Sequence, residues 1–151
     1  MNEKIKAIIP MPLQICIDDV GWWSGTDGHQ KNEPYRTGIN RRHCFEDYLA
    51  IHELGKKLGM RPQAGLILAE WDIKNTLKQV PSATWMGKHW KCPPIPLKEA
   101  EKIIALFNET KYIEPVLHGV CHEYWKNGKM SRAEWYDTSG KMREYDDVIK
   151  H

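Results

Sequence analysis

Short apolar runs alternate along this chain with longer stretches in which apolar residues recur at helical spacing. Three runs rich in aliphatic and β-branched residues predict buried strands, at residues 13–17, 64–69 and 112–117. Helical periodicity predicts helices at residues 41–58, 73–80, 97–108 and, in part, 131–145. Asn40 is suited to cap the first helix, Gly59 to end it, and Pro96 to begin the third.

The predicted elements follow the order strand, helix, strand, helix, helix, strand. Such alternation predicts a parallel sheet with crossover helices, and so an α/β fold. Each predicted strand ends in residues that can carry chemistry: Asp18-Asp19, Glu70-Trp71-Asp72 and His118. Because α/β folds place their sites at the carboxyl ends of parallel strands, these residues predict a site at that edge.

Two irregular segments interrupt this pattern and are expected to surround the same edge. Residues 21–38 form a polar, glycine-rich loop of a length that tends to be functional in a compact domain. Residues 81–96 contain four prolines and cannot form a helix interior. Both segments carry tryptophan, whose flat, amphipathic ring can stack on sugars.

Length and composition limit the class of protein. A chain of 151 residues predicts one domain, and a net charge of +2 gives no electrostatic case for nucleic-acid binding. The apolar runs are too short for a membrane span, and the first residues lack the apolar stretch of a signal peptide. We therefore expect a cytoplasmic protein, or one from which an export signal has been removed. The oligomeric state stays open.

The cysteines do not suggest a metal or redox motif of their own. Cys16, Cys44, Cys92 and Cys121 lie far apart and form no C-x-x-C pair, so we expect small buried side chains.

Two histidines four residues apart, His118 and His122, suggest a metal site. On one turn of a helix, both imidazoles would project from the same face, and Cys121 between them would point away. Together with one carboxylate they would leave coordination positions open for water and substrate, as catalytic sites do. Zn²⁺ is the first candidate, and Fe²⁺, Co²⁺ or Ni²⁺ would also suit these ligands. Iron oxygenases share the ligand set, but they are built on jelly-roll strands, which the α/β pattern argues against.

At these residues the chain resembles the polysaccharide deacetylase (NodB-homology) family. The family motif Thr-Phe-Asp-Asp-Gly corresponds here to Cys16-Ile17-Asp18-Asp19-Val20, and His-Ser/Thr-x-x-His corresponds to His118-Gly119-Val120-Cys121-His122. The resemblance covers these two short motifs, in the family's order. It implies a distorted (β/α) barrel with Asp18 as general base and with Asp19, His118 and His122 as metal ligands.

The chain departs from the family pattern at three points. Val20 replaces a glycine, and Gly119 replaces a hydroxyl residue. The family's later arginine and histidine motifs have no counterpart, and the only later histidine is His151. Because three βα units make about half of such a barrel, we expect residues 1–151 to form one deacetylase-like domain that is incomplete at its C-terminus, or the N-terminal half of the barrel.

The function expected from these residues is metal-dependent hydrolysis that removes an acyl group, most simply acetyl, from a glycan or a small amide or ester. Asp18 would take a proton as water attacks the carbonyl. Substrate contacts are expected from loop and strand-end residues: Trp22, Trp23, Arg36, Arg41, Glu70, Asp72, Trp85 and Trp90. Within this set, Glu70 and Asp72 are the nearest candidates to protonate the leaving group. The alternatives are a carbohydrate-binding module that has lost catalysis and a structural domain without metal.

Overall fold

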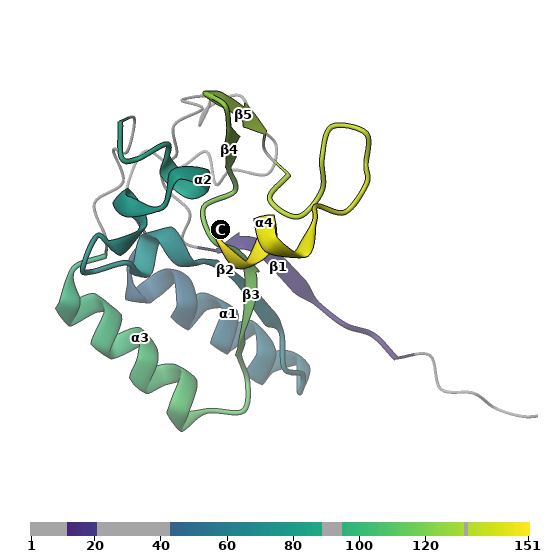
Figure 1. The fold of residues 1–151 in the computed structure, drawn as a ribbon. Coiled ribbons are helices and arrows are strands. Elements are labelled where there is room, and N and C mark those ends of the chain that lie inside the picture. The colour runs from purple at the N-terminus through teal and green to yellow at the C-terminus, as the bar shows by residue number, and fades with distance from the viewer. Residues whose placement is uncertain (1–11, 21–42, 89–94, 132) are drawn as a thin grey trace, which may run out of the picture.

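A three-stranded parallel sheet organises the protein in the computed structural model, which describes residues 12–20, 43–88, 95–131 and 133–151 (Figure 1). Its strands are β1 (Cys16–Val20), β2 (Gln63–Ile67) and β3 (Glu114–Gly119), in the order β1-β2-β3. The helices α1 (Phe45–Leu58) and α3 (Leu97–Glu109) connect consecutive strands. The alternating pattern of the sequence therefore does produce a parallel sheet, and its closure into a barrel stays a prediction.

The main core lies between this sheet and the two long helices. Tyr48 and Ile51 of α1 and Ile103 of α3 are buried against Val20 of β1 and Ala64 of β2. Burial of an aliphatic or aromatic side chain contributes roughly 1.5–3 kcal/mol, so this cluster fixes the helices on one face of the sheet.

Local signals set the bounds of α1. The Asp47 carboxylate accepts a hydrogen bond of 3.0 Å from the backbone N–H of Cys44 and so caps the start of the helix. Gly59 ends it in the left-handed conformation (φ +63°), as predicted. The helix thus begins at Phe45 and not at residue 41, and the predicted cap, Asn40, lies outside the described residues.

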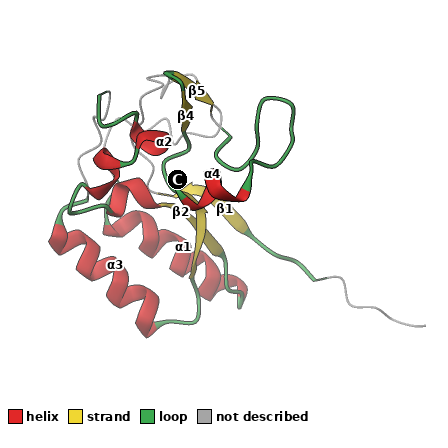
Figure 2. Ribbon diagram, in the orientation of Figure 1, coloured by secondary structure: helices red, strands yellow, loops and turns green. Residues whose placement is uncertain are grey.

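Shorter elements cover the carboxyl ends of the strands (Figure 2). After β2 come the 3₁₀ turns η1 (Leu68–Trp71) and η2 (Thr76–Gln79) and the short helix α2 (Pro81–Thr84). After β3 come an antiparallel hairpin, β4 (Tyr124–Lys126) with β5 (Lys129–Ser131), and the helix α4 (Tyr145–Ile149). A second, smaller core of Ile67, Ala69, Ala83 and Cys121 joins η1, α2 and the turn after β3 to the end of β2.

Several predicted elements are wrong in detail. The first strand begins at Cys16 and runs to Val20, so it includes both aspartates that were expected to follow it. Residues 73–80 contain a 3₁₀ turn in place of a helix, and residues 133–144, within the segment expected to be partly helical, are irregular and lead directly into α4. The segment that starts at Pro81 opens with a single helical turn, since proline is tolerated at the first position of a helix.

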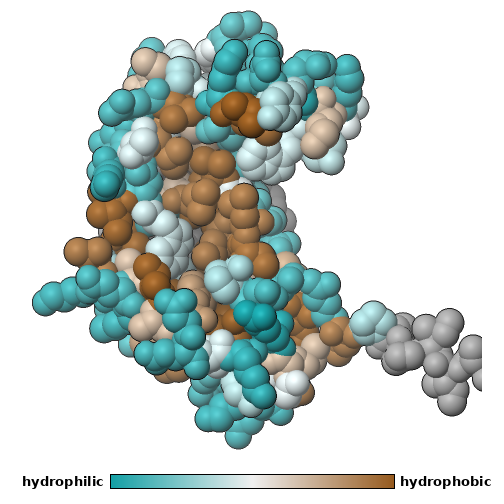
Figure 3. Space-filling view, turned by 60° about the horizontal axis from the view of Figure 1, so that its bottom comes forward, coloured by the Kyte–Doolittle hydropathy of each residue, from teal (hydrophilic) through white to brown (hydrophobic). Residues whose placement is uncertain are grey.

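Part of the surface is apolar. Figure 3 shows apolar surface gathered across the middle of one face of the molecule, with hydrophilic surface on both sides. Leu117, in the edge strand β3, is 62% exposed.

Among the described helices, none combines the length and apolarity that crossing a bilayer requires.

Candidate metal centre

The end of β1 places two adjacent carboxylates in different surroundings. In a regular strand, consecutive side chains point to opposite faces of the sheet. Here the register between β1 and β2 shifts between Ile17 and Val20, and Asp19 has a positive φ of 55°. Asp19 is consequently turned inward and is only 2% exposed, whereas the side chain of Asp18 is 62% exposed.

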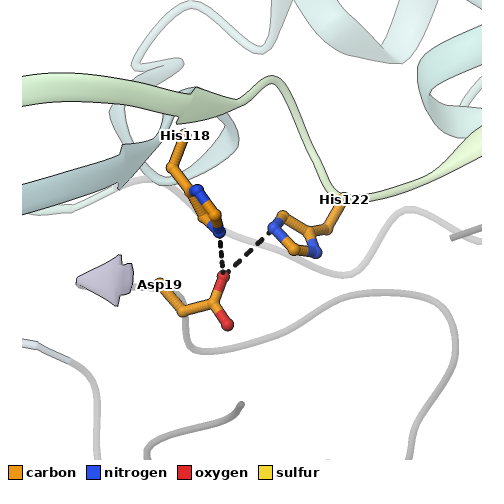
Figure 4. Close-up of side chains that lie close together, drawn as sticks. All are labelled: Asp19, His118 and His122. Carbon is orange, nitrogen blue, oxygen red and sulfur yellow. Dashed lines mark ion pairs between the residues drawn. The ribbon is translucent and has the colours of Figure 1, made fainter. Parts of the chain in front are cut away.

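The end of β3 brings two imidazoles to Asp19 (Figure 4). The Nε2 atom of His118 lies 3.3 Å from Asp19 Oδ1, and the Nε2 atom of His122 lies 3.1 Å from the same oxygen. The two rings are tilted against each other, with centroids 4.9 Å apart. Residues from β1 and β3, which flank β2 on opposite sides, therefore meet at one point.

The two histidines do not lie on one turn of a helix, the geometry considered for their spacing, and His118 lies at the end of the third strand as expected. His118 belongs to β3, and His122 lies in the turn that follows, with a φ of +58°. The imidazoles converge because the chain turns back after Gly119, a turn that is tied to η1 by a 2.7 Å hydrogen bond from the Ala69 N–H to the Val120 carbonyl. The two imidazoles therefore converge through a strand followed by a turn, and not through one turn of a helix.

The three facing atoms fit a divalent metal. One carboxylate oxygen and two imidazole nitrogens lie within 4.8 Å of one another. A tetrahedral zinc ion with bonds of about 2.0–2.1 Å holds its ligand atoms about 3.3–3.4 Å apart. The two Nε2–Oδ1 distances of 3.3 and 3.1 Å are close to that spacing. Three protein ligands leave at least one position for water or substrate, as in catalytic zinc sites.

Asp18 lies beside this centre without entering it. Its Oδ1 atom is 3.9 Å from Nδ1 of His118, on the side of the ring away from Asp19. The thiol of Cys16 donates a hydrogen bond of 3.4 Å to the same oxygen. Asp18 is thus near the imidazole that faces Asp19, yet remains open to solvent.

A buried glutamate, Glu134, holds the turn that carries His122. Its two oxygens accept hydrogen bonds from three consecutive N–H groups, those of Val120 (2.9 Å), Cys121 (2.5 Å) and His122 (2.6 Å). Burial raises the pKa of this carboxyl, but the hydrogen bonds from His151 and from the backbone outweigh burial and leave the pKa below its usual value. No local pattern marks this residue in the sequence, since it lies 12 positions after His122.

A second group of potential ligands, Cys121, Glu134 and His151, is committed to other bonds. The Cys121 thiol donates to the carbonyls of Ala83 (3.0 Å) and Glu123 (3.3 Å), and burial raises its pKa well above the usual value. Metal ligation requires the thiolate, which this environment disfavours. Cys121 is therefore a core residue and not a ligand.

The strand-end carboxylates expected near the substrate have other contacts. Glu70 is fully buried in η1, with Oε2 3.8 Å from Nε2 of His43. His43 in turn lies 2.7 Å from the Tyr48 hydroxyl. The Asp72 carboxylate accepts hydrogen bonds of 2.8 and 2.7 Å from the N–H groups that begin η2. These contacts tie Glu70 to the start of α1 and Asp72 to the start of η2.

The expected aromatic contacts are only partly within the described residues. Trp85 stacks on Trp125 of β4, with ring centroids 5.3 Å apart and planes 9° apart. The Lys88 ammonium lies 4.1 Å from the Trp85 ring centroid, so this ring already has an aromatic and a cationic neighbour. The remaining expected contacts fall outside the described residues, namely Trp22, Trp23, Arg36, Arg41 and Trp90.

Comparison with known proteins does not place the chain in a family. Protein-family models, curated proteins and solved structures were searched, and none of them matches it. The interpretation of the site therefore depends on its own geometry.

Proposed function

We propose that this protein is a metal-dependent hydrolase that removes acyl groups, most simply acetyl, from a carbohydrate or a related amide or ester. One observation carries the proposal: Oδ1 of Asp19 lies within 3.3 Å of Nε2 of both His118 and His122. Two imidazoles and one carboxylate with an open side suit Zn²⁺ first, and also Fe²⁺, Co²⁺ or Ni²⁺. The resemblance of the two motifs to polysaccharide deacetylases suggests the acyl substrate.

The orientation of His118 supports a division of labour between the two aspartates. If Nε2 of His118 binds metal, its ring proton is on Nδ1, the atom that faces Asp18 at 3.9 Å. A divalent ion held at this centre supplies Lewis acidity, which activates water and polarises the acyl carbonyl. Asp18, exposed beside the ligands, accepts the proton of the attacking water. Asp19, buried between the imidazoles, keeps the charge that neutralises the ion.

The proposal also includes a fold, namely that the parallel sheet belongs to a (β/α) barrel. Among the residues that the structure describes, the strands follow one another in the order β1-β2-β3, without the reversal that a doubly wound sheet shows at its switch point. β3 is an edge strand with an exposed leucine, Leu117. Pairing of further strands with this edge would continue the sheet in the sense that a barrel requires.

A carbohydrate-binding module without catalysis is the second candidate. The sequence lacks counterparts of the family's later arginine and histidine motifs. Glu70 and Asp72 are the carboxylates expected to protonate a leaving group. Glu70 instead lies against His43, and Asp72 accepts hydrogen bonds from the backbone of η2. A domain of this kind would bind metal and glycan but release no acetate.

Acetate release distinguishes the two functions. Protein loaded with Zn²⁺ or Co²⁺ is incubated with N-acetylated and O-acetylated oligosaccharides, with and without chelator. We expect chelator-sensitive acetate release, its loss in Asp18→Asn with metal retained, and loss of metal in Asp19→Asn. Glu101→Gln, on the exposed side of α3, is the matched carboxylate control and should leave both unchanged. Bound metal without turnover on any acyl substrate would favour the binding module, and absence of metal uptake would refute both.

A further inference from the structure

One carboxylate, that of Glu134, accepts hydrogen bonds from the backbone of the segment between the two histidines. The N–H groups of Val120, Cys121 and His122 all point to Glu134, at 2.5–2.9 Å. The Glu134 residue is only 5% exposed. Hydrogen bonds to an ionised carboxylate are about twice as strong as neutral ones, and three of them fix the direction of three successive peptide planes. The last of these planes belongs to His122, whose backbone has a positive φ.

Gly119 is sterically matched to this carboxylate. A β-carbon at Gly119 would lie 2.5 Å from Oε2 of Glu134 and 3.3 Å from Cδ2 of His122. A side chain at this position would therefore displace the carboxylate, the imidazole, or both. The absence of a side chain at the residue after His118 is thus a condition for the contact between Glu134 and the turn.

His151 holds Glu134 in place from the other side. Its Nε2 atom lies 3.4 Å from Oε1 of Glu134, and its side chain is 0% exposed. The ring packs against Tyr124 and Trp135, with centroids 5.4 and 5.7 Å away, and Nδ1 lies 3.2 Å from the Ser82 hydroxyl. Glu134 is consequently fixed between a packed imidazole and the backbone of the turn.

From these contacts we infer that Glu134 is a positioning residue for the metal centre, which it shapes by fixing the backbone between His118 and His122. The inference rests on the proposed function to the extent that the two imidazoles bind metal. It does not depend on the substrate or on turnover.

Metal affinity of the Glu134→Gln protein tests the inference. The amide keeps the size of the side chain but removes its charge and turns an NH₂ group toward backbone donors. Co²⁺ is titrated into metal-free protein, and the visible absorption of the bound cobalt reports ligand geometry as well as affinity. We expect binding about 10–100-fold weaker than in the original protein, the range found for residues that orient metal ligands, together with a changed cobalt spectrum.

Two control variants separate positioning from general stability. Asp137→Asn removes another carboxylate of the same segment that also accepts backbone N–H groups, those of Ser139 and Lys141, away from the histidines. Ile103→Val weakens the main core without touching the centre. Both variants should bind Co²⁺ with the original affinity and spectrum even where their melting temperature falls.

A double-mutant cycle tests the same contact without relying on Glu134→Gln to fold. Gly119→Ala should weaken Co²⁺ binding when Glu134 is present, because its β-carbon overlaps Oε2. In the Glu134→Ala background the overlap with Oε2 is gone and only the 3.3 Å approach to Cδ2 of His122 remains, so the same change should weaken binding by a much smaller factor.

The outcomes distinguish this inference from the proposed function. Cobalt binding that is equal in the original, Glu134→Gln and Gly119→Ala proteins would overturn the inference and leave the proposed function standing. Cobalt binding that Glu134→Gln weakens, with no acyl hydrolysis by the original protein, would support the inference and count against the hydrolase. No cobalt binding by the original protein would overturn both.

Discussion

Metal binding should stabilise this protein by joining two strands that are not paired with each other in the sheet. Asp19 lies near the end of β1, and His118 lies in β3, on the far side of β2. A metal held by both closes a loop of about a hundred residues, which contains α1, β2 and α3. Unfolding must break this link, because the unfolded chain does not hold the three ligands together. The prediction is a metal-dependent rise in melting temperature.

The expected size of the rise follows from mass action. A ligand that binds only the folded state at a hundred times its dissociation constant adds about 2.7 kcal/mol to the free energy of unfolding. For a chain of 151 residues, one kcal/mol corresponds to about 2–4 °C in melting temperature. We therefore expect a rise of about 5–11 °C when Zn²⁺ or Co²⁺ is present at that excess.

The assay is thermal unfolding followed by circular dichroism, with metal titrated into chelator-treated protein. Asp19→Asn should abolish the rise, because it replaces the carboxylate that faces both imidazoles with a weak neutral ligand. Asp18→Asn should keep it, since Asp18 lies 3.9 Å from His118 and outside the ligand set. An equal rise in the original and Asp19→Asn proteins would refute the proposed ligand set. Its loss in Asp18→Asn would refute the division of roles between the aspartates.

Three further predictions concern the elements that support the centre. Gly55→Ala should lower the free energy of unfolding, measured in urea, by about 1–2 kcal/mol. A β-carbon at this position would overlap the Tyr112 carbonyl oxygen, and this overlap outweighs the gain in helix propensity. An unchanged or higher stability would show that α1 can move to relieve the overlap. Asp72→Ala should cost about 1 kcal/mol by the same measurement, because it removes the cap of η2, whereas no loss would show that water replaces the cap. Glu99→Gln should destabilise the protein at neutral pH, because a hydrogen bond from the Lys102 ammonium, followed by one from the Phe45 N–H, lowers the pKa of the Glu99 carboxyl. A carboxyl whose pKa is lowered by folding stabilises the folded protein above its ordinary pKa of 4.5, and this stabilisation is lost as pH falls through the folded-state pKa. The difference in free energy of unfolding between the original and Glu99→Gln proteins should therefore shrink in acid. A difference that persists in acid would contradict the assignment.

The pattern of the sequence predicted those features of the fold that depend on periodicity. The apolar runs of β2 and β3 and the amphipathic stretches of α1 and α3 lie where expected, within a few residues. The gathering of Asp19 and the two histidines followed from the rule that parallel strands end at one edge of the sheet. These are consequences of hydrophobic burial and strand alternation, which a sequence records directly.

Other features depend on backbone conformations that periodicity does not record. The interval of four residues between His118 and His122 matches one helical turn, although the strand pattern also predicts His118 at the end of a strand. The structure reaches the same convergence with a strand and a turn in which His122 adopts a positive φ. The hairpin of β4 and β5 was missed although its signal was present. Asn127-Gly128 occupies its turn with φ values of 53° and 74°, the conformation that this dipeptide favours between strands.

Gly119 shows how a departure from a motif can be resolved by contacts from distant parts of the chain. In the family that the motif resembles, a hydroxyl residue follows the first histidine, and its replacement by glycine removes a group that often supports the site. Here the space that a β-carbon would fill is 2.5 Å from Oε2 of Glu134, whose carboxylate accepts three hydrogen bonds from the following peptide groups. Support for the turn is therefore provided by a residue that lies beyond the hairpin, which no motif centred on the histidines could include. Gly119→Ser, which restores the hydroxyl of the motif, should consequently weaken metal binding, because its β-carbon makes the same overlap, and stronger binding by this variant would contradict the role assigned to Glu134.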